Sequence, residues 1–248
     1  MNNYTSFDAV SRIEKAVLAL GTFDGMHLAH RHLAEKVRQD AAKNNGISVL
    51  VSFHSHPRKI VSDDFNHGIL TTQNEKVEIL TKIGLNNLIT MDFTTEISNM
   101  SYIDFIHFLK TKIDIQKIVL GYNHHFGKSR RGNYATLLQL GADLHFEVEK
   151  IEKQTIDGLD VSSSSIRNAL NSGDIETANK LLGYNYSICI QAYCDKNEVS
   201  LTQDKLLPKN GHYTVKIDER NFVLEIKYPH LWVDLKNNGF YKVEFVKK

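Results

Sequence analysis

The segment Gly21–His30, with the sequence GTFDGMHLAH, decides the fold that we expect for this chain. It directly follows the apolar run Ala16–Leu20, which has the length of one buried strand. Its two glycines allow the backbone to turn tightly and to approach a ligand closely. A helical pattern follows, so strand, glycine loop and helix succeed one another. This order suits the binding of a phosphate group at the start of the helix.

Two histidines in this segment are candidates for catalysis. His27 and His30 are three residues apart, so on the opening turn of a helix they share one face and both reach an anion held at its N-terminus. Imidazoles there can stabilise charge that develops on a phosphate as it is displaced. The alternatives are two surface histidines or part of a zinc site, but no cysteine lies nearby. Together with the glycine loop and Asp24, the pair favours a catalytic site.

The sequence around this segment alternates short apolar runs with helical periodicity up to about Gly183, which predicts a parallel sheet wrapped by helices. The expected strands are Ala16–Leu20, Ser48–Phe53, Asn87–Met91 and Lys117–Leu120, and the expected helices are His30–Asn44, Asn74–Ile83, Tyr102–Ile113, Tyr134–Leu140 and Asp174–Leu182.

The pattern changes after Gly183. Apolar and polar residues then alternate with a period of two over Tyr213–Ile217, Phe222–Ile226 and Tyr241–Phe245. We therefore expect two domains, residues 1–184 and a small antiparallel β domain over residues 185–248, with the boundary near Tyr184.

Composition limits the partners of the chain. Its 248 residues are 42% hydrophobic, and 30 basic against 29 acidic residues leave a net charge of +1, so no global charge favours nucleic acid or an anionic membrane. No apolar stretch approaches a membrane span or a secretion signal, which predicts a cytoplasmic protein. Cys189 and Cys194 are expected to point to opposite faces of a strand as reduced thiols. The sequence implies no particular oligomeric state.

A second candidate segment is Val161–Arg167, with the sequence VSSSSIR. Its hydroxyl groups precede a helix that we expect to begin near Ile166, where serines can cap the helix and free N–H groups attract phosphate. Arg167 in the first turn adds a charged fork suited to a triphosphate. The alternative is a simple helix cap.

A third candidate segment is Gly121–Asn133, with the sequence GYNHHFGKSRRGN. It follows an expected strand and combines aromatic, amide and cationic groups between glycines. Such a loop can hold a planar ring and its phosphate tail, although a solvated basic loop has the same composition.

These segments resemble motifs of the HxGH nucleotidyltransferases, and in particular of the bacterial bifunctional riboflavin kinase/FAD synthetase family. Gly21–His30 resembles G-x-F-D-G-x-H-x-G-H, with Ala29 in place of a glycine, and Ser162–Arg167 resembles S-S-T-x-I-R. The third segment resembles the flavin-side motif G-x-[DN]-F-x-F-G-K-x-R-x-G, with His124 in place of an aromatic residue. Ser52–Pro57 resembles T-F-x-P-H-P, with Ser55 in place of a proline.

The resemblance implies a Rossmann-like doubly wound parallel sheet that carries the nucleotidyltransferase site, and a transfer of AMP from ATP to FMN that gives FAD and pyrophosphate. It implies Mg²⁺ as the cofactor. The implied catalytic residues are His27 and His30, the implied ATP-binding residues are Gly21, Phe23, Asp24, Ser162, Ser163, Ser164 and Arg167, and the implied FMN-binding residues are Asn123, Phe126, His56 and Pro57.

The resemblance is weaker in the second domain. The family has a riboflavin kinase barrel of over a hundred residues there, with an early G-x-P-T-x-N segment, whereas residues 184–210 of this chain contain no glycine and Pro208 as their one proline. We therefore expect a shortened, degenerate barrel without kinase activity. Transfer to another phosphorylated acceptor, or a regulator that binds flavin or nucleotide without catalysis, are the alternative functions.

Overall fold

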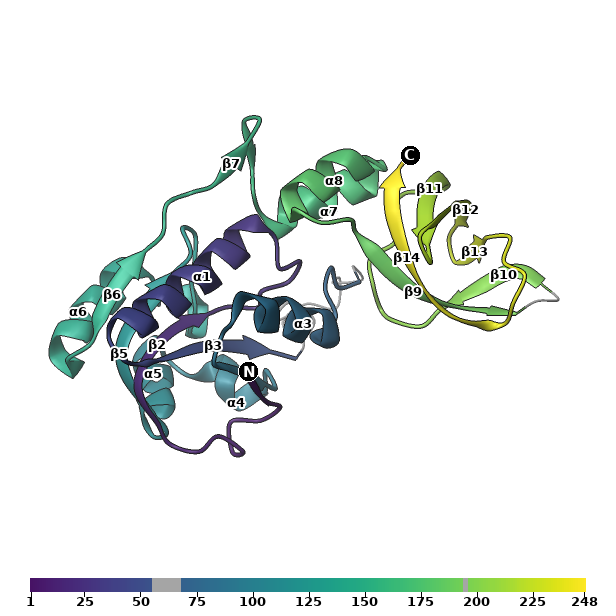
Figure 1. The fold of residues 1–248 in the computed structure, drawn as a ribbon. Helices are drawn as coiled ribbons and strands as arrows, with labels where there is room; N and C mark the ends of the chain where they lie inside the picture. Colours follow the sequence, from purple (N-terminus) through teal and green to yellow (C-terminus); the bar gives the residue numbers. More distant parts are fainter. Residues whose placement is uncertain (55–67, 194–195) are drawn as a thin grey trace. The chain divides into compact units, whose positions relative to one another are not determined.

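The structure, a computed structural model, describes residues 1–54, 68–193 and 196–248, which fall into two compact units (Figure 1). The first unit contains residues 1–54 and 73–153, and the second contains residues 68–72, 154–193 and 196–248.

The first unit is built on a parallel sheet with the strand order β1-β4-β3-β2-β5-β6. From β2 the chain moves outward through β3 and β4, and it then returns to place β5 on the other side of β2. The order reverses between β2 and β5, and in open α/β sheets ligands bind at the carboxyl ends of the strands at such a point. The strands are β1 (Asn2–Tyr4), β2 (Ile13–Leu20), β3 (Ile47–Phe53), β4 (Asn87–Met91), β5 (Ile113–Leu120) and β6 (Glu147–Lys150).

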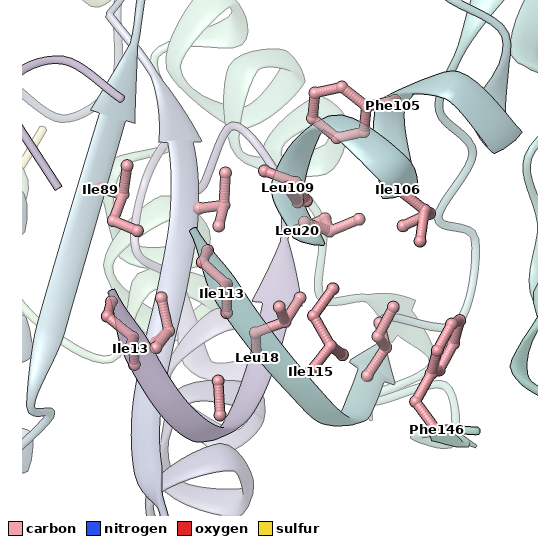
Figure 2. Close-up of a cluster of buried hydrophobic side chains, with 14 of the residues drawn as sticks. Ile13, Leu18, Leu20, Ile89, Phe105, Ile106, Leu109, Ile113, Ile115 and Phe146 are labelled. Atoms are coloured by element: carbon pink, nitrogen blue, oxygen red, sulfur yellow. The ribbon is translucent and has the colours of Figure 1, made fainter. Parts of the chain in front are cut away.

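Helices cover both faces of this sheet. Successive residues of β2 point to opposite faces, so Val17 and Ala19 pack against α1 (Leu28–Lys43) and α3 (Gln73–Ile83). Leu18 and Leu20 pack on the other face in the cluster that holds residues of α5 (Tyr102–Lys110) and α6 (Tyr134–Leu144). Figure 2 shows this second cluster, with Leu20 beside Leu109 of α5 and Leu18 among Ile113 and Ile115 of β5. The short helix α4 (Thr95–Asn99) precedes α5.

The predicted strands and helices of this sheet are confirmed in type and place, but several bounds were wrong. Strands β2 and β5 begin at Ile13 and Ile113, three and four residues before the predicted starts, and α6 continues to Leu144 instead of Leu140. The helix predicted over Tyr102–Ile113 ends at Lys110, because Thr111 turns its hydroxyl back to the Phe108 carbonyl (2.7 Å) and Ile113 already begins β5. Ile113 and Ile115 are both buried, so the apolar run of the helix continues into the strand without a break in hydrophobicity.

The second unit begins with helices and ends in a barrel. It contains the short hairpin β7 (Thr155–Ile156) and β8 (Leu159–Asp160), then α7 (Ser163–Ser172) and α8 (Ile175–Leu182). Six antiparallel strands close a barrel in the order β10-β13-β12-β11-β14-β9, with Tyr213, Leu224 and Phe245 fully buried. The predicted antiparallel β domain is thus confirmed. Its strands are β9 (Ser187–Tyr193), β10 (Lys196–Leu201), β11 (Gly211–Ile217), β12 (Arg220–Lys227), β13 (His230–Trp232) and β14 (Gly239–Lys247).

Helix α8 belongs to the same compact unit as the barrel. Its Asn179 side chain accepts a hydrogen bond from the Tyr186 N–H (2.7 Å) and donates one to the Phe245 carbonyl (2.8 Å), which ties the helix to β14. The compact unit therefore starts well before Tyr184, and the functional boundary at that residue stays a prediction. Cys189 lies in β9, whereas Cys194 lies outside the described residues. No helix within the described ranges is long and apolar enough to cross a membrane.

Neighbouring residues of β12 allow a matched test of the barrel core. Leu224 is fully buried, whereas Val223 is 62% exposed. We expect Leu224→Ala to lower the free energy of unfolding of the barrel by about 2–5 kcal/mol, because it removes buried methyl groups and leaves a cavity. Val223→Ala should cost less than about 1 kcal/mol. Urea unfolding followed by the fluorescence of Trp232, the one tryptophan of the chain, measures both; equal costs would contradict the closed barrel.

Candidate active site

The loop after β2 has a tightly constrained backbone. The Gly21 N–H donates to the carbonyl of Val51 in β3 (3.1 Å), and the chain then turns through Phe23 (φ 50°), Gly25 (φ 90°) and Met26 (φ 34°). A positive φ is costly for residues with a side chain, so it persists only where the surroundings hold it. Phe23 and Met26 are 1% and 0% exposed, which anchors the turn in the core.

A buried lysine holds the same loop from α3. The Lys76 ammonium donates to the Thr22 carbonyl (2.9 Å) and to the Ser52 hydroxyl (2.9 Å), and Ser52 also donates to the Thr22 carbonyl (3.2 Å). Burial lowers the pKa of Lys76 to about 8, although the charge of Asp24 opposes this shift. Lys76 was not among the predicted site residues. The available signal was its position one helical turn before the buried Leu80, on the face of α3 that packs on the sheet.

The two predicted catalytic histidines lie together at the start of α1. His27 is the N-cap of the helix, and its Nδ1 accepts a hydrogen bond from the His30 N–H (3.4 Å). The two rings stack with centroids 3.6 Å apart, and the Phe23 ring meets the His30 ring edge-on at 5.4 Å. The prediction that both histidines share one face is thus confirmed.

Both imidazoles are neutral at physiological pH. Burial lowers the pKa of His27 to about 4, with a smaller opposite effect from Asp24 and a further lowering from Arg31. Burial also lowers the pKa of His30 well below its usual value, and the charges of His27 and Lys76 add to this. Nδ1 of His30 is buried and has no hydrogen-bond partner among the residues that the structure describes.

Beside this loop lies a cavity of about 710 Å³ within the first unit. Gly21 and Thr22 of the loop after β2 form part of its wall, and Asn123 and Phe126 come from the loop after β5, so the cavity lies at the point where the strand order reverses. Aromatic rings dominate the remaining wall. The side chains that contribute them are Phe53, Phe93 and Phe105.

The loop after β5 is folded rather than extended into solvent. Phe126 and Gly132 exchange backbone hydrogen bonds of 3.0 and 2.9 Å, and the Lys128 N–H donates to the Met100 carbonyl (2.8 Å). Gly127 has a φ of 71°, and a side chain there would approach the Tyr102 nitrogen to 2.7 Å. This folded backbone brings two predicted FMN-binding residues, Asn123 and Phe126, to the cavity wall, while Lys128 and Arg131 are exposed, so the FMN contacts stay predictions. His56 and Pro57, the other two, lie outside the described residues.

The serine segment belongs to the second unit. Helix α7 begins at Ser163, three residues before the expected start, because the Ser162 hydroxyl caps it by accepting from the Ser165 N–H (3.1 Å). Ser163 and Ser164 therefore lie in the first turn, and Arg167 follows in the second turn rather than the first. The Arg167 guanidinium donates to the Gly68 carbonyl (2.7 Å). The ATP contacts expected for these four residues stay predictions.

Phe23 and Asp24, also expected to bind ATP, are 1% and 7% exposed. The Phe23 side chain packs in the core, so only the backbone of this residue is available to a ligand. In residues 1–54, 68–193 and 196–248 no group of three or more His, Cys, Asp or Glu side chains is arranged to hold a metal ion.

Comparison with known proteins identifies the family. A model of the FAD synthetase family matches residues 10–165. The chain belongs to this family. A bifunctional riboflavin kinase/FMN adenylyltransferase of Listeria monocytogenes is 31% identical over 211 residues, which cover 81% of this chain and 67% of that protein. The protein of the same description from Bacillus subtilis is 30% identical over 215 residues, covering 82% of this chain and 68% of that one.

The family resemblance expected from the sequence is therefore confirmed, and the chain is a member of a nucleotidyltransferase family. It spans about two thirds of the length of these relatives. A crystal structure of a macrolide-efflux protein from Streptococcus pneumoniae has a TM-score of 0.85 at 18% identity, covering 99% of this chain and 90% of that one. At that identity the likeness concerns the fold alone.

The buried charge of Lys76 makes a prediction about stability and pH. Its pKa is about 8 in the folded state and about 10.4 in an unfolded chain, so between these values the unfolded state binds more protons and stability rises with pH. Relative to Lys76→Met, the wild type should gain roughly 3 kcal/mol between pH 7.5 and 10.5. Urea unfolding followed by circular dichroism measures this difference.

Lys82→Met is the matched control for this measurement. Lys82 lies on the same helix with a side chain 73% exposed. Its substitution should change stability by a small amount that varies little over this pH range. A Lys76→Met difference equally independent of pH would contradict the buried ammonium.

Proposed function

We propose that the protein is an FMN adenylyltransferase, which transfers AMP from ATP to FMN and releases pyrophosphate. The observation that supports the proposal is that one loop borders the aromatic cavity and also leads to the histidine pair at the start of α1. Gly21 and Thr22 belong to the loop that leads to the histidine pair, and they also line the aromatic cavity. A flavin in the cavity would thus present its phosphate to a nucleotide at the start of α1.

The reaction is a direct displacement. An oxygen of the FMN phosphate attacks the α-phosphorus of ATP, the bond from that phosphorus to the bridging oxygen of the β-phosphate breaks, and its electron pair leaves with pyrophosphate. No covalent enzyme intermediate is needed, so catalysis rests on positioning and on charge stabilisation. Mg²⁺ enters as part of the MgATP substrate, where it neutralises charge on the phosphates.

The histidine pair stabilises the charge that develops on the α-phosphate. Because His27 and His30 are neutral, each stabilises the transition state as a hydrogen-bond donor rather than as a cation. His27 is buried and His30 is half-buried with its Nδ1 inaccessible, so little solvent has to reorganise around them during the proposed reaction. Gly21, the Phe23 backbone and Asp24 bind ATP in this proposal. Ser162, Ser163, Ser164 and Arg167 are assigned to ATP by the sequence resemblance alone.

The aromatic cavity accepts the flavin. Phe126 offers a ring face to the isoalloxazine, and Asn123 offers an amide to its polar groups. His56 and Pro57 complete the FMN site by resemblance. The volume and the aromatic lining of this cavity match a large planar ring, which favours a flavin over a small phosphorylated acceptor.

We further propose that the barrel has no riboflavin kinase activity and that the enzyme acts in the cytoplasm, where ATP is available. The segment of residues 184–210 contains no glycine. Much of it forms strands β9 and β10, which pair with each other. Within the described part of these two strands, backbone groups are used in strand pairing, with one shift of register between Lys196 and Ser200.

One incubation tests the function. The protein is mixed with ATP, Mg²⁺ and either FMN or riboflavin, and the flavins are separated by chromatography. We expect FAD from FMN, and neither FMN nor FAD from riboflavin. Flavin binding without FAD formation at any Mg²⁺ concentration would favour a regulator, and FMN formed from riboflavin would refute the inactive barrel.

Replacement of His30 separates catalysis from stability. His30→Ala should lower kcat for FAD synthesis by about 10²–10³-fold, because it removes a donor to the transition state, while the melting temperature changes by a few degrees. His32 lies on the same helix and is exposed, so His32→Ala should leave kcat unchanged. A similar loss of kcat in both variants would contradict the assigned role.

A further inference from the structure

His124 lines the aromatic cavity and has a buried ring nitrogen without a hydrogen-bond partner among the described residues. The residue lines the cavity, and its ring stacks on Phe126 with centroids 5.8 Å apart and planes 24° apart. Its Nε2 is buried and makes no hydrogen bond to any residue in the described part of the chain. Buried polar atoms without a partner are rare because each costs stability, so such an atom at a cavity wall indicates a contact that a ligand completes.

The phenylalanine rings of the cavity wall offer no hydrogen-bond partner to Nε2 of His124. Phe53 and Phe105 have ring centroids 6.5 Å apart, and Phe105 and Phe126 have centroids 6.0 Å apart, so these three rings form one continuous apolar surface. Such a surface suits the flat ring of a flavin. His124 stacks on Phe126, at one end of this row of rings. A polar atom at that position can bond only to a polar part of the ligand.

The charges around His124 indicate which part of the ligand that is. Arg130 lines the same cavity as His124 and brings a positive charge to its wall. Gly21 and Thr22, in the loop that leads to the histidine pair, line this cavity too. A cation and the start of that loop at one cavity create a place for an anion. Burial lowers the pKa of His124 to about 4, with smaller contributions in the same direction from His125 and Arg130, so the imidazole is a neutral donor.

We propose that His124 donates a hydrogen bond from Nε2 to the phosphate of the acceptor and thereby selects the phosphorylated flavin over riboflavin. The inference rests on the proposed function, and it adds a specificity-determining residue to that site. A neutral imidazole keeps one N–H for this bond, and the phosphate accepts it. The phosphate is thereby held at the end of the cavity that faces His27 and His30.

Equilibrium binding of two flavins tests this role without any turnover. FMN and riboflavin are titrated with wild type and with His124→Phe in the absence of ATP, and the quenching of flavin fluorescence gives the Kd. Phenylalanine keeps the stacking on Phe126 but removes the nitrogen. We expect the Kd for FMN to rise about tenfold and the Kd for riboflavin to stay unchanged, as for the loss of one hydrogen bond to a charged group.

Two further variants complete the experiment. His124→Gln carries an amide donor and should recover part of the preference for FMN. His107 is an exposed residue of α5 that does not line the cavity, so His107→Phe should leave both Kd values as in wild type. Circular dichroism confirms that each variant is folded.

The outcomes are distinct. An equal weakening of both flavins in His124→Phe would mean that the nitrogen contacts the ring system, and unchanged affinities would mean that it contacts neither part; both overturn the inference. If wild type binds neither flavin, the proposed function itself fails. Wild type that binds both flavins with equal Kd also refutes a selective contact to the phosphate.

Discussion

The geometry of the site depends on the buried ammonium group of Lys76. Removing a charge from water is costly, and here three features offset part of that cost: the Thr22 carbonyl, the Ser52 hydroxyl and the nearby charge of Asp24. The Thr22 carbonyl belongs to the loop after β2, and the Ser52 hydroxyl belongs to β3. The ammonium therefore fixes the loop to the neighbouring strand, and the strained turn at Phe23 is possible because its flanks cannot move.

In the proposed reaction, burial also determines how the histidine pair would act. A protonated imidazole would attract the triphosphate more strongly, but burial opposes protonation of both His27 and His30. A neutral donor in a site of low polarity still interacts strongly with charge that appears during the reaction. It also holds the product less tightly than a cation would. The arrangement thus favours stabilisation of the transition state over tight binding of the ground state.

Much of the fold followed from the sequence, because buried strands and amphipathic helices leave regular hydrophobic patterns. The edge strands β1 and β6 were missed, since residues such as Asn2 and Glu147 give no apolar run. The end of α5 was missed because buried residues continue across the junction to Ile113. Periodicity records burial, and it cannot record a turn that leaves burial unchanged.

The site was predicted less completely, for a related reason. His27, His30 and the loop after β5 were found because a motif keeps chemically informative residues close in sequence. Lys76 and Phe105 act on the site from separate helices, and nothing in their immediate sequence reports the loop or cavity that they reach. The cap of α7 shows the same limit, since four consecutive serines left open which hydroxyl would accept the hydrogen bond until Ser162 was seen to do so.

Thr22 connects these observations. Its carbonyl is held by Lys76 and Ser52, and the residue also lines the aromatic cavity. One stretch of backbone therefore borders both the aromatic cavity and the loop that leads to the histidine pair. In the proposed reaction, an attacking oxygen and an α-phosphorus must be held within about 3–3.5 Å in line for displacement, and small errors in that distance are costly. Because Lys76 and Ser52 fix this loop to α3 and β3, the proposed displacement, which needs no covalent intermediate, would take place beside a wall that the sheet positions.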